Sequence, residues 1–592
     1  MLGPVFNREA TVAPKRPRLY LSRSLYLLTL FLLLCTGYLV LSGMRPLRTA
    51  GDLSRFGGSM FLLLAPLQML LLTFQAAVGA TSSVAQEKDR RTLILMLLTR
   101  LSGFEVVVGK LASSLIVVLS MLAAALPLFL VLPLFGGVSA GQVADVYAVT
   151  LSTLVFATAV GTVVGLWREK TFQSIAFTVL AIILWVAIWE IVGTGIIPGL
   201  ASEWAAFGSP IRALLSALSP LPASGSLSVG PAVGYSLFTL LVATAVTAIG
   251  IARVRVWNPS REVRIKPSES ETEPAAIDGS TATAATWKAR TARPVWSNPI
   301  LWREVRTWAY GRKVLLIRLA YLLICALVAA ILYVSVQNGL AFERTGVGGR
   351  TLPAVTLPVA AIGVISLLLV NALAVNSVTT ERDVLALDLL MVTDLRPAEF
   401  VFGKIWGVLY VTKEMLLIPL AMLITLGWLG VMTIENTFYA TTGALVLYLF
   451  VATVGVHCGL NYPAGRTATL VSLGTVFFLC VGVAICMVIM VSFRGAFELQ
   501  LPPFLAMILG GGAGLYAALG WRNPSSAIFV ASFTLPLITF YAITQFLLQR
   551  DQLFVWLPVV CGYLFATAAM LIPALSEFDV SLEQNRGGEP SE

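Results

Sequence analysis

Charged side chains are scarce in this 592-residue chain: Asp, Glu, Lys and Arg make up 12% of it, while 58% is hydrophobic. Soluble domains carry about 25% charged residues, so the composition excludes an ordinary soluble protein. Apolar runs of about 20 residues recur from end to end, and each is long enough to cross a bilayer as a helix. The runs are continuously apolar rather than alternating, which predicts membrane-spanning helices and excludes a barrel.

The chain also has few histidines and no closely spaced cysteine pairs. The chain has one histidine, His457, and six cysteines, which all lie inside apolar runs and form no CxxC pair. We therefore expect no metal site, no disulfide framework and no cofactor in this chain, with His457 packed or hydrogen-bonded. The net charge of +10 falls in short loops, which is typical of a membrane protein oriented by Lys and Arg and does not indicate nucleic-acid binding.

A phosphate-binding loop of the form G-x-x-x-x-G-K-[ST] is missing as well. The nearest approach runs from Gly103 to Lys110, but five residues separate its glycines and Leu111 follows the lysine. No polar stretch is long enough for a nucleotide-binding domain, and no nucleophile–base arrangement is evident. We therefore expect that the chain is not an enzyme, and that energy for any transport comes from another polypeptide or from an ion gradient.

The apolar runs form two groups. In the first half, spans are predicted near 25–43, 59–80, 106–134, 145–166, 171–197 and 231–251. In the second half, they are predicted near 314–336, 353–378, 401–433, 438–461, 467–493, 501–520, 526–548 and 555–575. The segments 501–520 and 526–548 are either two spans or one re-entrant hairpin, because the run Gly510-Gly511-Gly512 permits a broken helix. The total is therefore twelve or fourteen spans.

A polar segment separates the two groups. Residues 258–292 are rich in Ser, Thr, Pro, Ala and Glu, cannot bury enough apolar surface to fold, and are predicted to be a flexible linker. The first module is then 1–257 and the second 293–592. Pro4–Glu9 and Pro299–Trp308 are predicted to be interfacial amphipathic helices that lead into each module. Basic loops concentrate on one side, so both termini and the linker are predicted to be cytoplasmic.

The chain contains an internal repeat. Ala80–Lys110 aligns without a gap with Ala374–Lys404, and thirteen of the thirty-one positions are identical. Chance similarity between apolar helices matches Leu and Val, whereas this alignment matches Glu, Asp, Thr, Gly and Lys. We therefore predict an all-α, polytopic membrane helical bundle built from two six-span repeats. An even number of spans in the first module makes the repeats parallel.

The repeated segment is a charged loop between the second and third spans of each module. The first copy supplies Glu87, Lys88, Asp89, Arg90, Arg91 and Thr92, followed by Glu105 and Lys110. The second copy supplies Glu381, Arg382 and Asp383, followed by Glu399 and Lys404. A short helix with apolar residues at Leu93, Leu97 and Leu101 could pack under the spans or on the bilayer, with its charged start facing water.

These segments resemble the type-2 ABC permease family, the membrane subunits of many bacterial exporters. The likeness rests on the amphipathic start, the six spans, the acidic-basic loop followed by Thr and Leu, and the Gly-Lys pair entering the third span, and it is strongest over 76–134 and 370–430. Two departures are visible: Arg91 stands where the family usually has Gly, and Ala386 replaces Thr92 in the second copy.

The resemblance implies a function. It implies a permease subunit in the bacterial plasma membrane whose charged loops couple to two copies of a separate ATPase subunit, and which moves an unspecified substrate across the lipid bilayer. The residues listed above for both copies would then carry ATPase coupling. The plainer alternative is that Lys88, Arg90 and Arg91 only anchor the topology.

Two charged residues, Lys413 and Glu414, lie inside the ninth predicted span. A charge at the bilayer centre costs at least about 2.5–3.5 kcal/mol on insertion scales, so we expect each to face a partner or a wet cavity. They would lie in the proton or substrate path under the rival hypothesis, a secondary transporter driven by an ion gradient, and the plainer alternative is a salt bridge that packs the bundle. A membrane scaffold that transports nothing is a third hypothesis.

Overall fold

The fold is that of a computed structural model of the chain. The structure describes residues 3–12, 15, 17–44, 49–168, 171–193, 204–219, 230–258, 296–306, 314–337, 339, 344–347, 350–353, 355–383, 390, 395–492, 501–548 and 551–586. Most of the predicted linker, and the part of the second charged loop at 384–389 and 391–394, lie outside the described residues.

The described chain is helical almost throughout. The first half forms α1 (Gly3–Val12), α2 (Pro17–Met44), α3 (Ala50–Asp89), α4 (Thr92–Leu98), α5 (Gly103–Phe135), α6 (Ala140–Trp167), α7 (Thr171–Gly193), α8 (Ala205–Gly208), α9 (Pro210–Leu218) and α10 (Pro231–Trp257). The second half forms α11 (Pro299–Arg306), α12 (Val314–Gln337), α13 (Thr356–Asp383), α15 (Pro397–Val411), α16 (Lys413–Trp428), α17 (Ile434–Asn461), α18 (Gly465–Ser492), α19 (Leu501–Leu519), α20 (Ser526–Leu547) and α21 (Gln552–Arg586).

Local sequence explains where many of these helices begin. Thr49, Ser102 and Ser139 each cap a helix with a reciprocal bond from the residue three positions on, which satisfies amide groups that have no partner within the helix. Proline occupies the first turn of α9, α10 and α15, where its missing N–H costs nothing. Inside lipid the helix satisfies every backbone group internally, so apolar runs of this length fold as helices.

The prediction of an all-α, multi-pass membrane protein is confirmed. Thirteen described helices are long and apolar enough to cross a membrane, and the bent pair α15–α16 raises the total to fourteen if it counts as one span. The single span predicted at 401–433 is therefore broken: its two helices meet at Thr412 at an angle of 61°. One small antiparallel hairpin, which was not predicted, lies between α12 and α13 and is formed by β1 (Arg344–Val347) and β2 (Arg350–Pro353).

The segments 501–520 and 526–548 form two full spans and not a re-entrant hairpin. At one end of α19, the carbonyl of Ala518 accepts a hydrogen bond from the hydroxyl of Tyr462, which follows α17 (2.9 Å). At its other end, Phe504 shares a core with Met490 near the far end of α18. The glycine run does not break α19, and its role is close packing: a Cβ at Gly512 would lie 2.5 Å from the ring of Phe533 on α20.

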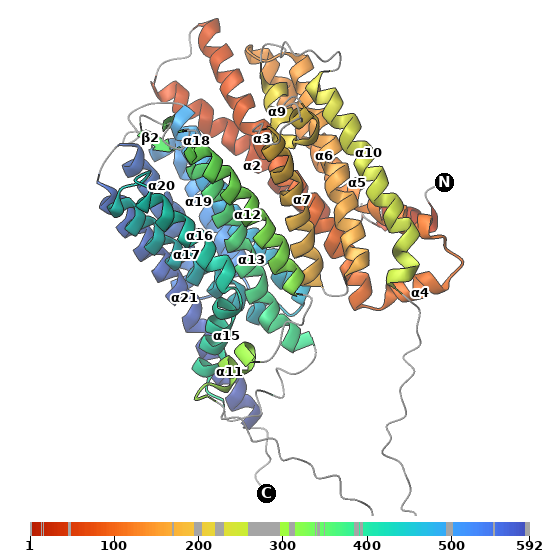
Figure 1. Ribbon diagram of the computed structural model, residues 1–592, viewed down its shortest axis with the longest axis vertical. Helices are drawn as coiled ribbons and strands as arrows, with labels where there is room; N and C mark the ends of the chain where they lie inside the picture. The colour runs from red at the N-terminus through yellow and green to blue at the C-terminus, as the bar shows by residue number, and fades with distance from the viewer. Residues whose placement is uncertain are drawn as a thin grey trace, which may run out of the picture.

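The two halves lie side by side and pack along a shared seam (Figure 1). The seam brings α7 against α12, α3 against α18 and α2 against α19. Near its middle, the rings of Phe74 on α3 and Phe477 on α18 stack with centroids 4.0 Å apart. Both main cores include residues from both halves, so the described helices form one continuous bundle.

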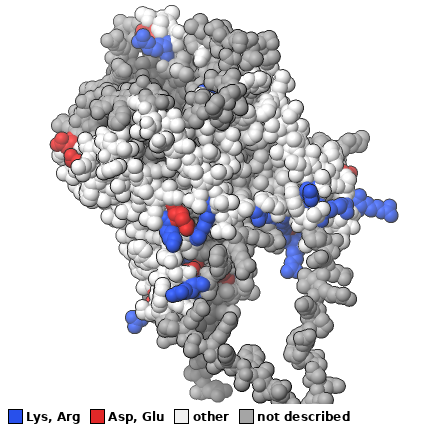
Figure 2. All heavy atoms as spheres, in the orientation of Figure 1, with Lys and Arg blue, Asp and Glu red and all other residues white. Residues whose placement is uncertain are grey.

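The predicted interfacial helices are present as α1 and α11, and each packs on the start of the third span of its own half, α5 or α15. In Figure 1, α4 and α11 lie toward the lower end of the bundle. Figure 2 shows a surface that is mostly uncharged, with basic side chains concentrated toward that lower part. We call this the charged end, where α3 ends at Asp89 and α13 ends at Asp383.

Candidate functional site

The charged loop of the first half is held by ionic and hydrogen-bonding contacts at its base. Glu87, in the last turn of α3, forms an ion pair with Lys110, whose side chain is buried in α5. The ammonium group of Lys88 donates to the carbonyl oxygens of Leu166 and Arg168 at the end of α6, the second at 2.9 Å. These two lysines therefore fix the end of α3 to both α5 and α6.

The second half has a larger cluster at the corresponding place. The Nζ atom of Lys404 on α15 lies 2.6 Å from Glu381 of α13 and 2.5 Å from Glu304 of α11. It also donates to the carbonyl oxygen of Ser377 at 3.0 Å, and its side chain is completely buried. Arg303 adds a second ion pair to Glu381. Three helices thus meet on one buried ammonium group.

Aligned residues make the same kind of contact in both halves. Glu87 and Lys110 pair as Glu381 and Lys404 do. Lys88 bonds to carbonyls at the end of α6, and Arg382 bonds to the carbonyl of Tyr462 at the end of α17. These are contacts within each half; the repeat itself remains a prediction from the sequence.

Both charged segments lie at the same end of the bundle. Gln86, beside Glu87, accepts a hydrogen bond from Arg466 near the start of α18. Arg382, beside Glu381, bonds to Tyr462, which lies four residues before Arg466 in the chain. The bond between Gln86 and Arg466 also joins the two halves directly across the seam.

Glu105 and Glu399 have structural positions at the start of the third span. Oε2 of Glu105 accepts the backbone N–H of Ser102 at 2.8 Å, and the hydroxyl of Ser102 accepts the N–H of Glu105 at 3.2 Å. Oε2 of Glu399 accepts the backbone N–H of Arg396 at 3.3 Å. Each glutamate thus closes the first turn of its helix, where its negative charge also suits the helix dipole.

The turn between α3 and α4 leaves basic side chains exposed. Arg90 and Arg91 are both exposed, and Arg91 has a backbone φ of 58°, the left-handed region that favours glycine. The hydroxyl of Thr92 donates to the carbonyl oxygen of Glu87 at 3.2 Å, which tightens the turn. The side chains of Asp89 and Asp383 lie outside the described residues.

Helix α4 packs one face under the spans, as its apolar spacing predicts. Leu93 and Leu97 are buried in a small core with Val84, Val106 and Leu166. The opposite face presents three apolar side chains to the exterior: Ile94, Leu95 and Leu98. An exposed apolar face flanked by arginines is suited to contact with a partner surface or with the bilayer.

Lys413 and Glu414 lie at the break between α15 and α16. Glu414 faces Arg318 of α12, with 3.6 Å between Oε2 and Nε. Lys413 is exposed, and its ammonium group lies 5.1 Å from the ring centroid of Tyr410. Among the described residues, the expectation that each would have a partner is met for Glu414 by the ion pair with Arg318 and for Lys413 by the ring of Tyr410.

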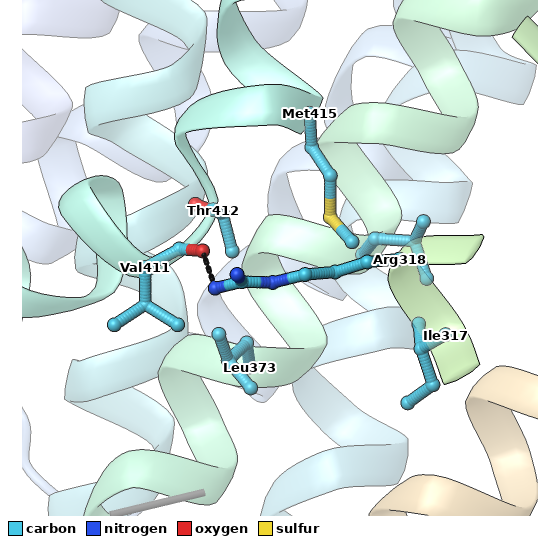
Figure 3. Close-up of a pocket in the computed structure, with 7 residues that line it drawn as sticks. Ile317, Arg318, Leu373, Val411, Thr412 and Met415 are labelled. Carbon is cyan, nitrogen blue, oxygen red and sulfur yellow. Dashed lines mark hydrogen bonds between the residues drawn. The ribbon is translucent and has the colours of Figure 1, made fainter. Parts of the chain in front are cut away.

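Arg318 is the residue that sequence reasoning missed here. Its Nη2 atom donates to the carbonyl oxygen of Val411 at 2.5 Å, across a small pocket that Thr412 and Met415 also line (Figure 3). The carbonyl lies at the last residue of α15, where a helix leaves its carbonyls without internal partners. The available signal was the position of Arg318 inside the apolar run predicted to span at 314–336.

Compared with known proteins, the sequence matches no family model and no curated protein. The many apolar helices are those of a transporter-like, multi-pass membrane protein. The described residues contain no group of three His, Cys, Asp or Glu side chains able to hold a metal ion. His457 is buried and hydrogen-bonded to the carbonyl oxygen of Leu519 at 2.9 Å, as expected for a packed histidine.

Proposed function

We propose that this chain is the membrane-spanning permease subunit of an ATP-driven exporter of the type-2 ABC kind, located in the plasma membrane with its charged end in the cytoplasm. Two copies of a separate ATPase subunit bind at that end and hydrolyse ATP. The observation that carries the proposal is one ion pair in each half, Glu87 with Lys110 and Glu381 with Lys404. Each ion pair links a charged segment to the third span of its half.

The ion pairs give these segments mechanical continuity with the bundle. A force applied to α4 reaches α3 and α5 through Glu87 and Lys110, and reaches α6 through Lys88. In the second half, Lys404 binds α11, α13 and α15 together. Movement of an ATPase pair would therefore shift groups of spans as units, and the seam between the halves is where parallel repeats would open.

The predicted coupling residues fall into two groups by their contacts. The positioning residues are those that pair where each charged segment joins its spans: Glu87, Lys110, Glu381 and Lys404. The partner-facing groups of the first half are the exposed arginines of the turn and the exposed apolar face of α4, formed by Ile94, Leu95 and Leu98.

The test is co-purification of the full chain with ABC-type ATPase subunits encoded beside it. Replacing Leu95 and Leu98 together with serine removes apolar contact area from α4 without touching its buried face, so ATPase recovery should fall by roughly tenfold or more, as expected for the loss of two buried leucines. Ile434→Ser, which removes an even more exposed apolar side chain at the start of α17, is the control and should leave recovery unchanged. Equal recovery from all variants would contradict the proposal.

Charge reversal at Glu87 and Glu381 is a less direct test, although it follows from the sequence alone. Each carboxylate faces a buried lysine, so a second positive charge there would disturb the base of the loop as well as any partner contact. Weaker ATPase association in that double variant supports the proposal only if thermal stability is retained.

An ion-gradient-driven transporter is the second candidate, favoured by the broken span that carries Glu414, which faces Arg318 of α12. Discontinuous helices form ion and substrate sites in many secondary transporters. In proteoliposomes without ATPase, this candidate predicts uptake driven by a pH gradient and lost in Glu414→Gln. Transport that requires ATP and the ATPase subunit would exclude it.

A further inference from the structure

A hydrogen bond joins the two halves at the charged end of the seam. The side-chain oxygen of Gln86, in the last turn of α3, accepts this bond from Nη1 of Arg466, the second residue of α18. Neither residue belongs to the ion pairs that attach the charged segments to their spans. Both side chains are partly buried, so water competes for the bond less than it would at an exposed surface.

The same two helices meet again deeper in the bundle, where the rings of Phe74 and Phe477 stack. Along α3, Gln86 lies about 18 Å from Phe74, and along α18, Arg466 lies about 17 Å from Phe477, at a rise of about 1.5 Å per residue. Because α3 ends at the charged end and α18 begins there, both contacts belong to one antiparallel pair of helices. The hydrogen bond thus closes the charged end of the α3–α18 contact, and the aromatic stack closes its middle.

Apolar packing alone favours a closed seam only weakly in a membrane. Lipid chains solvate an apolar helix face nearly as well as another helix does, so close packing and interhelical hydrogen bonds decide which arrangement is preferred. Separation of Phe74 from Phe477 exchanges one apolar contact for another. Separation of Gln86 from Arg466 breaks a hydrogen bond whose donor is charged, which is a stronger interaction.

The turn that leads into α18 is also attached to the second charged segment. Nη1 of Arg382, in that segment, donates to the carbonyl oxygen of Tyr462, four residues before Arg466. The hydroxyl of Tyr462 donates to the carbonyl oxygen of Ala518 at the end of α19, at 2.9 Å. Arg466 therefore connects the first charged segment, through Gln86, to a turn that the second charged segment holds in place.

A buried polar side chain lies one turn deeper along α3. Ser82 is four residues before Gln86 and therefore on nearly the same face of the helix. Its side chain is completely buried, and its hydroxyl has no hydrogen-bond partner among the described residues. A buried hydroxyl without a partner costs free energy, and that cost is removed when the charged end of the seam opens and admits water.

We propose that Gln86 and Arg466 form a latch that holds the charged end of the seam closed and makes the two charged segments move together. When the bond breaks, the seam opens at this end and Ser82 becomes accessible to water. Arg466 is a positioning residue that acts through Gln86 and through the turn at Tyr462. The opening is a property of this chain alone, and its use in transport rests on the proposed function.

The experiment measures how fast a cysteine introduced as Ser82→Cys reacts with N-ethylmaleimide in the full chain in detergent, without an ATPase partner. A buried thiol reacts only while its site is open, so the rate, read by mass spectrometry of the peptide around position 82, reports the open population. Arg466→Met should raise that rate roughly tenfold, the usual effect of losing one hydrogen bond to a charged group. Gln86→Met should have a similar effect, and combining the two should add little, because both remove the same bond.

Two controls separate opening of the seam from general loosening of the bundle. Arg253→Met removes an exposed arginine from α10 and should leave the rate at position 82 unchanged. The native Cys458, which is completely buried in α17, should react at its wild-type rate in every variant. Arg382→Met, which detaches the turn at Tyr462 from the second charged segment, should raise the rate at position 82 by a smaller factor than Arg466→Met.

Three outcomes would overturn the latch: an unchanged rate in Arg466→Met, additive effects of the Gln86 and Arg466 changes, or an equal rise at Cys458. A rate that Arg382→Met does not alter would overturn the link between the two charged segments. All of these rates are measured on the chain by itself, so a failure of ATPase recovery would contradict the proposed function and leave the latch standing.

Discussion

The carbonyl oxygen of Met415 lies one helical turn before Pro419, which has no amide hydrogen to donate to it. Two tyrosine hydroxyls from neighbouring helices donate to that oxygen instead: Tyr448 of α17 at 3.3 Å and Tyr321 of α12 at 3.5 Å. The hydroxyl of Tyr321 also lies 2.7 Å from that of Ser366. The tyrosine hydroxyls thus replace the hydrogen bond that Pro419 cannot make, and they stabilise the bent third span of the second half.

This relationship predicts a coupling between substitutions at two sites. Tyr448→Phe should destabilise the protein by about 0.5–1.5 kcal/mol, the range for interhelical hydrogen bonds in membranes. In a Pro419→Ala background the loss should shrink toward zero, because a backbone N–H at 419 can donate to Met415. Thermal unfolding of all four proteins in detergent gives the coupling free energy. Strictly additive effects would show that the tyrosine does not serve the freed carbonyl.

Lys404 should be the most sensitive charged residue of the described bundle. Lys404→Met leaves the buried carboxylate of Glu304 and the partly buried carboxylate of Glu381 without their shared ammonium group, which should cost about 3–5 kcal/mol. Lys110→Met removes a single pair with Glu87 and should cost less. Adding Glu304→Gln to Lys404→Met should recover part of the loss. The measurement is the unfolding midpoint in detergent, and equal losses for the two lysine variants would contradict this account.

Two glycines of α17 provide a matched pair for helix packing. A Cβ at Gly455 would lie 2.5 Å from that of Ala374 and 2.9 Å from the carbonyl oxygen of Asn371, whereas a Cβ at Gly443 would meet nothing within 4 Å. Gly455→Ala should therefore destabilise the protein by about 1–3 kcal/mol through overpacking of α17 on α13. Gly443→Ala should be neutral or stabilising by about 0.4–1 kcal/mol. Thermal unfolding compares them, and a neutral Gly455→Ala would refute the close approach.

Accessibility labelling tests the orientation. In a background where the exposed Cys561 is replaced by serine, cysteines are introduced singly at Leu95 on α4 and at Trp428 at the far end of α16; both native side chains are exposed. With the charged end in the cytoplasm, an impermeant thiol reagent added to intact cells should label the Trp428→Cys protein and not the Leu95→Cys protein. Breaking the cells should expose the second. Labelling of Leu95→Cys in intact cells would reverse the orientation.

The apolar helices could be predicted from residue order alone, because a lipid-facing backbone must satisfy its own hydrogen bonds and a run of apolar residues can do so only as a helix. Residue order also predicted that α4 has a buried face, since Leu93 and Leu97 are four residues apart and lie on one side of a helix. Residue spacing and polarity are local properties, so both predictions needed no knowledge of neighbouring helices.

The contacts between side chains on different helices could not be predicted in this way. The inward direction of Glu87, the partner of Glu414 and the close packing at Gly512 depend on helices distant in sequence: α5, α12 and α20. A buried charge needs a counter-ion, and a glycine at a helix contact needs a close neighbour. The residue type alone does not specify which helix supplies that counter-ion or neighbour. The break at Thr412 also depends on distant helices, because donors from α12 and α17 satisfy the carbonyls that a bent span leaves free.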